Sequence, residues 1–99
     1  MVQAYVLIKV EAGSDAKVSA DIVKLSQIIR ATRALVKVSA NIAKLSQIIS
    51  ASTTYGISDI IVEVDVPNIE ELDDFVFDKI RKIPGVNETI TLIKAKKIL

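Results

Sequence analysis

The sequence predicts an α+β protein, a ferredoxin-like βαββαβ sandwich whose first helix is enlarged or duplicated. Three observations lead to this fold class. Apolar residues alternate with others over residues 2–11 and again over 60–66, which is typical of strands that bury one face. Apolar residues recur at intervals of three and four over two longer stretches, which is typical of helices packed on a sheet. The order of these elements matches the split βαβ arrangement.

The first predicted strand covers residues 2–11. Tyr5 and Leu7 make its outer side partly apolar, and the inward side is apolar and largely β-branched: Val2, Ala4, Val6, Ile8 and Val10. The Gly13-Ser14-Asp15 sequence then predicts a turn that leads into a helix cap.

Residues 17–36 and 37–56 are two copies of one segment. Both contain the sequence Lys-Val-Ser-Ala-x-Ile-x-Lys-Leu-Ser-Gln-Ile-Ile, which begins at Lys17 and again at Lys37. Each copy places four apolar residues on one helical face: Val18, Ile22, Leu25 and Ile29, then Val38, Ile42, Leu45 and Ile49. We interpret the repeat as a duplication within the first helix.

Two arrangements of the repeat are open. Residues 16–55 contain no Gly or Pro, and residues 30–35 contain good helix formers, which favours one continuous helix over residues 16–50, about 50 Å long. Twenty residues advance a helix by about 200°, so its two apolar stripes would face nearly opposite ways. The alternative is a break near Thr32, with one copy packed on the sheet and the other looped aside.

The second half of the chain predicts strand, turn, strand, helix and strand. Residues 50–55 form the short strand, and Gly56-Ile57-Ser58-Asp59 form the turn. The next strand ends at Pro67 and points four residues inward: Ile60, Val62, Val64 and Val66.

Asn68 and Glu71 have the spacing of a capping box at the start of the second helix, and Pro84-Gly85 stops that helix. Its predicted buried face consists of Leu72, Val76, Ile80 and Ile83. The final strand places Thr89, Thr91, Ile93 and Ala95 on one side and Ile90 and Leu92 on the other.

The composition excludes most catalytic chemistry. The chain has no Cys and no His, which removes thiol nucleophiles, imidazole bases and the usual zinc ligands. No phosphate-binding loop or Gly-x-Ser-x-Gly motif is present. The acidic residues of the second helix suit its first turns better than a cation site: Glu70, Glu71, Asp73, Asp74 and Asp78. We therefore expect no enzyme, no cofactor and no metal.

Charge and hydropathy point to a cytoplasmic protein without a membrane or nucleic-acid partner. The net charge is +1, and no apolar run is long enough to span a bilayer. Lysines near the C-terminus and two arginines could contact phosphates, but they lack interleaved aromatic residues: Arg30, Arg33, Lys94, Lys96 and Lys97. The first strand begins at the N-terminus, so we expect no helix-turn-helix before it and no DNA binding by this chain alone.

Residues 1–13 and 55–99 resemble the effector-sensing (RAM) domain of Lrp/AsnC-type regulators, in its stand-alone form. The resemblance lies in the order and spacing of four motifs: residues 55–64 (Tyr-Gly-Ile-Ser-Asp-Ile-Ile-Val-Glu-Val), Leu72-Asp73-Asp74-Phe75, Ile83-Pro84-Gly85-Val86 and Thr89-Ile90-Thr91. It implies one RAM-like domain over residues 1–99, with an inserted or duplicated segment within 17–56.

The resemblance also implies a function. Such domains pair through their sheets into homo-oligomers, and they bind amino acids or similar small molecules at the turn after the second strand. Here that turn is Tyr55, Gly56, Ile57, Ser58 and Asp59, and Ser58 stands where the family often has an aromatic residue. Asp59 could bind a ligand amino group or accept backbone hydrogen bonds in the turn.

An outer sheet face that is apolar usually meets a partner, so we expect an oligomer interface at Tyr5, Leu7, Ile61 and Leu92. The alternative function is an engineered scaffold or a conformational switch, in which the duplicated helix changes folding or assembly.

Overall fold

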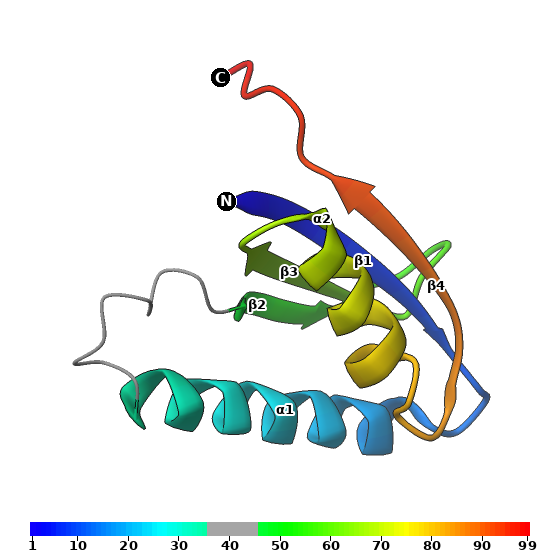
Figure 1. Ribbon diagram of the computed structural model, residues 1–99. Coiled ribbons are helices and arrows are strands. Elements are labelled where there is room, and N and C mark those ends of the chain that lie inside the picture. The colour runs from blue at the N-terminus through cyan, green and yellow to red at the C-terminus, as the bar shows by residue number, and fades with distance from the viewer. Residues whose placement is uncertain (36–45) are drawn as a thin grey trace.

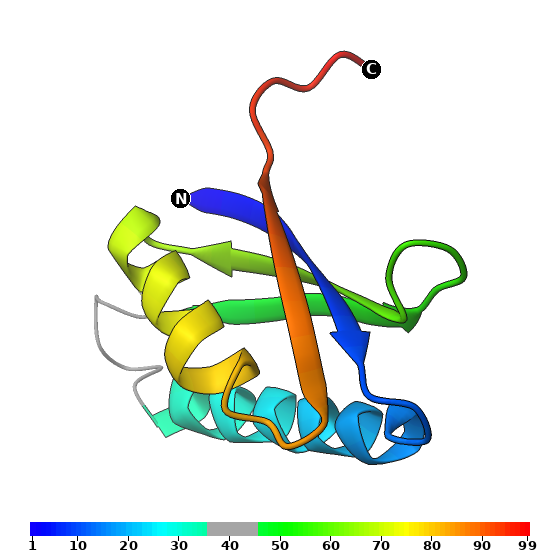
Figure 2. The same cartoon turned by 90° about the vertical axis from the view of Figure 1, so that its right-hand side faces the viewer.

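The computed structural model describes residues 1–35 and 46–99 of the chain. One antiparallel sheet has the strand order β2-β3-β1-β4, formed by β1 (Val2–Val10), β2 (Gln47–Thr53), β3 (Ile60–Val66) and β4 (Val86–Ile93). Helix α1 (Asp15–Leu35) and helix α2 (Ile69–Asp74), which continues as the π-helix η2 (Phe75–Ile80), lie on one side of this sheet (Figures 1 and 2). The predicted α+β class and βαββαβ order are confirmed.

The core lies between the sheet and the helices. Strands β1 and β3 are neighbours, and both point alternate residues into the core as predicted: Ala4, Val6 and Ile8 from β1, and Ile60, Val62, Val64 and Val66 from β3. From α1 come Val18 and Ile22, with Leu25 and Ile29 partly buried beside them. The first copy of the repeat therefore packs on the sheet as a helix.

The continuous helix favoured from the sequence is wrong, because residues 47–50 lie in β2. Gln47 and Ile48 pair with Asp65 and Val64 of β3, so the backbone groups of this stretch are satisfied by a ladder rather than by a helix. The alternative, a break near Thr32 with one copy packed on the sheet, is closer to the structure, since α1 ends at Leu35 and its residues Val18 and Ile22 lie in the core. The other apolar positions of the second copy, Val38, Ile42 and Leu45, lie outside the described residues.

The second helix begins as predicted and then widens. Asn68 Oδ1 accepts a hydrogen bond from the backbone N–H of Glu71 at 2.9 Å, which confirms the predicted N-cap. Beyond Asp74 the helix is π-helical, and the Arg81 N–H donates to the Val76 carbonyl five residues back. Phe75 and Val76 both lie in the core, whereas Ile83 lies past the helix and is only partly buried. Phe75 was not among the predicted core residues, although its position three residues after Leu72 fits the spacing of one helical face.

No helix in residues 1–35 or 46–99 is long and apolar enough to cross a bilayer.

Candidate functional site

The turn between β2 and β3 is held by hydrogen bonds at its base. The Thr54 N–H donates to the Asp59 carbonyl at 2.9 Å, and Thr54 Oγ1 donates to the Ser58 carbonyl at 2.8 Å. The hydroxyls of Thr54 and Ser58 are 3.0 Å apart, and Ser58 is only 6% exposed. Ser58 is therefore a buried part of the turn. Thr54 was not among the predicted site residues, although hydroxyl side chains commonly bond to the backbone in turns.

Asp59 ties the turn to the centre of the sheet. Its N–H donates to the Ile8 carbonyl, and its Oδ2 accepts from the Val10 N–H at 2.9 Å. The sequence left two roles open for the Asp59 carboxylate, a ligand contact or a backbone hydrogen bond within the turn. In the structure it accepts a backbone hydrogen bond, but from β1 and not from within the turn.

The tip of the turn consists of Tyr55, Gly56 and Ile57. Tyr55 is fully exposed and Ile57 is 73% exposed, which is unusual for two large apolar side chains so close together. Gly56 has a φ of +111°, and a Cβ added there would meet nothing within 4 Å. Figure 2 shows the turn projecting past the sheet beside β1. The structure thus separates the predicted site residues into an outward tip and an inward base at Ser58 and Asp59.

The sheet face opposite the helices carries an apolar patch. Two rows of cross-strand neighbours form it: Ile61–Leu7–Ile90 and, one step along the strands, Tyr5–Leu92. Leu92 is 52% exposed, Ile90 is 43% exposed, and the others are partly buried. The predicted interface residues Tyr5, Leu7, Ile61 and Leu92 all lie on this open face, and Ile90 joins them. The sequence had placed Ile90 on the correct side of its strand without assigning it to the interface.

Polar residues border the apolar patch on the same face. Ser50 and Glu63 lie opposite each other beside Tyr5, with Ser50 Oγ 3.4 Å from Glu63 Oε1. A further row contains Gln47, Asp65, Gln3 and Lys94, and Lys94 Nζ donates to Gln3 Oε1 at 3.2 Å. Asp65 Oδ1 is buried in this row and has no hydrogen-bond partner within the described part of the chain.

Residues 22–98 match the model of the Lrp/AsnC ligand binding domain. The chain belongs to this family. It is 33% identical over 93 residues to the HTH-type transcriptional regulator FL11 of Pyrococcus abyssi, an alignment that covers 94% of this chain and 48% of that protein. The chain thus spans about half the length of this relative.

Two solved structures show the same fold. TTHA0845 of Thermus thermophilus has a TM-score of 0.73 and 23% identity, with 100% of this chain and 99% of that chain covered. The regulator NMB0573 of Neisseria meningitidis, solved as a complex with L-Met, has a TM-score of 0.62 and 15% identity, with 99% of this chain and 52% of that chain covered. The expectation of a non-enzymatic domain agrees with membership of a family of ligand-binding domains of transcriptional regulators.

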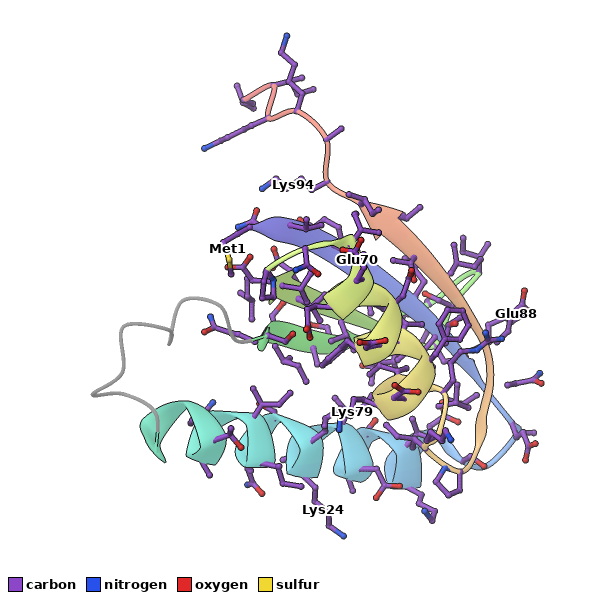
Figure 3. All side chains as sticks on the ribbon, in the orientation of Figure 1. Met1, Lys24, Glu70, Lys79, Glu88 and Lys94 are labelled. Atoms are coloured by element: carbon purple, nitrogen blue, oxygen red, sulfur yellow. The ribbon has the colours of Figure 1, made fainter. Side chains whose placement is uncertain are left out.

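Two labelled lysines of this Lrp/AsnC domain lie at opposite ends of the molecule. Figure 3 shows Lys24 on the outer side of α1 and Lys94 at the opposite end of the molecule, where the C-terminal tail begins. Within residues 1–35 and 46–99, no group of three or more acidic side chains could hold a metal ion.

Replacing Asp59 with alanine should destabilise the domain, and replacing it with asparagine should have a much smaller effect. Alanine leaves the Val10 N–H without its acceptor, which costs about 1–3 kcal/mol, whereas an asparagine carbonyl can still accept this bond. Urea unfolding of the two variants measures the difference. Equal losses of unfolding free energy would show that the negative charge of Asp59, and not its bond to β1, is what matters.

Proposed function

We propose that this Lrp/AsnC domain is a self-assembling sensor that binds an amino acid or a similar small molecule at the tip of the β2–β3 turn. The observation that carries the proposal is the tip itself, where Tyr55 and Ile57 are exposed on a turn whose base is fixed. A preorganised backbone with outward apolar side chains can bind a ligand with little loss of conformational entropy. Family membership supports ligand binding as the role of the domain.

The convex shape of the tip supports binding between copies of the chain. Small-molecule sites are usually concave and cover most of the ligand surface. A projecting turn supplies only one wall, so the other wall must come from a second molecule. We propose that this is another copy of the same chain.

The open sheet face supports self-assembly. Its patch of Tyr5, Leu7, Ile61, Ile90 and Leu92 is bordered by polar residues, as the core of a protein interface is bordered by a polar rim. The buried Asp65 Oδ1 beside this patch supports the same proposal, because a buried acceptor without a donor is costly. A donor from the facing copy would satisfy this oxygen. The sheet pairing would form dimers, and the turns would bring dimers together around the ligand.

The residues at the tip limit the ligand chemistry. Residues 55–57 contain no charged side chain, so an amino-acid zwitterion would be held there by backbone groups, with Tyr55 and Ile57 against its side chain. This arrangement favours an apolar amino acid. Methionine is the first one to test, because a neighbour of the same fold was solved with L-Met. We propose no direct contact with nucleic acid by this chain.

Isothermal titration calorimetry against the twenty amino acids tests the proposal. We expect binding of an apolar amino acid, and we expect Tyr55→Ser to weaken it at least tenfold, because the loss of a buried aromatic contact costs about 1.5–3 kcal/mol. Ile98→Ser is the matched control, since Ile98 is 93% exposed in the C-terminal tail, away from the turn. The absence of heat with all twenty amino acids at millimolar concentration would refute amino-acid sensing.

A further inference from the structure

One short sequence takes two different structures in this chain. Gln27-Ile28-Ile29 lies within α1, and the identical Gln47-Ile48-Ile49 begins the edge strand β2. The similarity continues beyond the tripeptide, since residues 27–33 read Gln-Ile-Ile-Arg-Ala-Thr-Arg and residues 47–53 read Gln-Ile-Ile-Ser-Ala-Ser-Thr. The part of α1 that contains residues 27–33 therefore resembles β2 in sequence.

Few tertiary contacts hold this part of α1 as a helix. Ile28 is 64% exposed, and Gln27, Arg30, Ala31 and Thr32 are largely outside the core as well, while Ile29 is partly buried. The β-branched residues Ile28, Ile29 and Thr32 also favour strand over helix. The helix here depends mainly on its own backbone bonds.

The position beside β3 is held mainly by the backbone ladder to β3, with Ile48 packed against the core. β2 is at the edge of the sheet, and residues 49–53 are all exposed. The known register shows what residues 27–33 would meet in this position, because each residue number shifts by 20. Ile28 would lie opposite Val64 as Ile48 does, and Thr32 would lie opposite Ile61 as Ser52 does. Arg30 would replace Ser50 opposite Glu63, which turns a 3.4 Å polar contact into a pair of opposite charges.

We propose that residues 27–33 are a second, exchangeable edge strand, which can leave α1 and replace β2 beside β3 within the same chain. In the exchanged form α1 would end near Leu25, and residues 34–59 would connect the new strand to β3. The cost of closing a loop rises only slowly with its length, so this longer connection does not exclude the exchange. The exchange would break the Thr54–Asp59 turn, because Thr54 would no longer follow the edge strand. The exchange does not depend on ligand binding and can be tested without a ligand.

Cysteine cross-linking tests the exchange directly, because the chain contains no cysteine. In the observed structure Thr32 is on α1, on the helix side of the sheet, and Ile61 is on the open face. A disulfide in the Thr32→Cys/Ile61→Cys variant therefore does not form within one chain in the observed structure, but it can form when residues 27–33 occupy the β2 position. Ser52→Cys/Ile61→Cys is the positive control, since these residues are cross-strand partners.

The matched negative control is Ala31→Cys/Ile61→Cys. Ala31 is exposed on the same part of α1, but in the exchanged strand it would point to the opposite side of the sheet from Ile61. We expect the Thr32 pair to form an intrachain disulfide roughly tenfold faster than the Ala31 pair, because only the former reaches disulfide geometry. Adding Arg30→Glu to the Thr32→Cys/Ile61→Cys variant should slow formation of its disulfide, since the introduced carboxylate would face Glu63 in the exchanged strand.

Mass spectrometry of the non-reduced protein distinguishes the outcomes. Equal rates for the Thr32 and Ala31 pairs would overturn the proposal, because general unfolding of α1 would explain them. Disulfides found only between two chains would overturn it as well. In the cross-linked Thr32 variant, amide hydrogen exchange at Thr54 should be roughly tenfold faster than in the Ser52 control, since the turn bond is lost. Unchanged protection at Thr54 would contradict the loss of the turn.

Discussion

The Leu7→Lys variant should be a folded monomer at concentrations where the proposed self-assembly would give dimers or larger oligomers of the unaltered chain. Leu7 lies in the middle of the open face, between Ile61 and Ile90. In the free domain a lysine there can extend into water, so the fold should persist. In a face-to-face pair the ammonium group would be buried among apolar side chains, and an unpaired buried charge costs several kcal/mol. Each 1.4 kcal/mol weakens association about tenfold, so we expect a loss of at least about a hundredfold.

Native mass spectrometry and sedimentation measure this change. Val23→Lys is the matched control, because Val23 is 55% exposed on α1 and receives the same added charge away from the open face. Circular dichroism should show both variants folded. If Leu7→Lys keeps the oligomeric mass of the unaltered chain, assembly does not use this face.

The Gly85→Ala variant should lose roughly 2–4 kcal/mol of unfolding free energy, from backbone strain and overpacking together. Gly85 has a φ of +98°, a conformation that side chains with a Cβ rarely adopt. A Cβ at this position would lie 2.9 Å from Ser14 Cβ and 3.0 Å from Val18 Cγ2. Val18 is a core residue and cannot move easily. The Gly85 carbonyl also accepts from the Glu11 N–H, so a shift of this backbone would disturb the link between β1 and α1.

Gly13→Ala separates the two causes. Gly13 also has a positive φ, of +83°, but an added Cβ there meets nothing within 4 Å. The Gly13→Ala variant should therefore lose only the unfolding free energy that comes from backbone strain, about 1 kcal/mol. Urea denaturation compares the two variants. Equal losses would mean that the approach of Gly85 to α1 has no energetic consequence.

Much of the candidate site could be predicted from local sequence. Gly56-Ile57-Ser58-Asp59 is a typical turn sequence between two apolar strands, and alternation placed Tyr5, Leu7, Ile61 and Leu92 on one face. Local sequence could not predict that the turn divides into an exposed tip and an inward base. Ser58 is buried and Asp59 bonds to Val10, 49 residues earlier, because β3 pairs with β1. Such a bond depends on strand order, which no local pattern contains.

The sequence alone determined the fold class, the inward residues of β1 and β3 and the cap at Asn68, because each follows from short-range periodicity or from neighbouring side chains. The sequence also contains one residue pattern twice, but it did not determine what structure each occurrence forms. Gln-Ile-Ile has one set of intrinsic propensities, yet it is helical in α1 and extended in β2. Only the tertiary structure decided between these states. Residues 47–49 are followed by the turn to β3, and they pair with that strand. Residues 27–29 instead follow residues of α1 that are buried on the sheet, and they continue the helix of those residues.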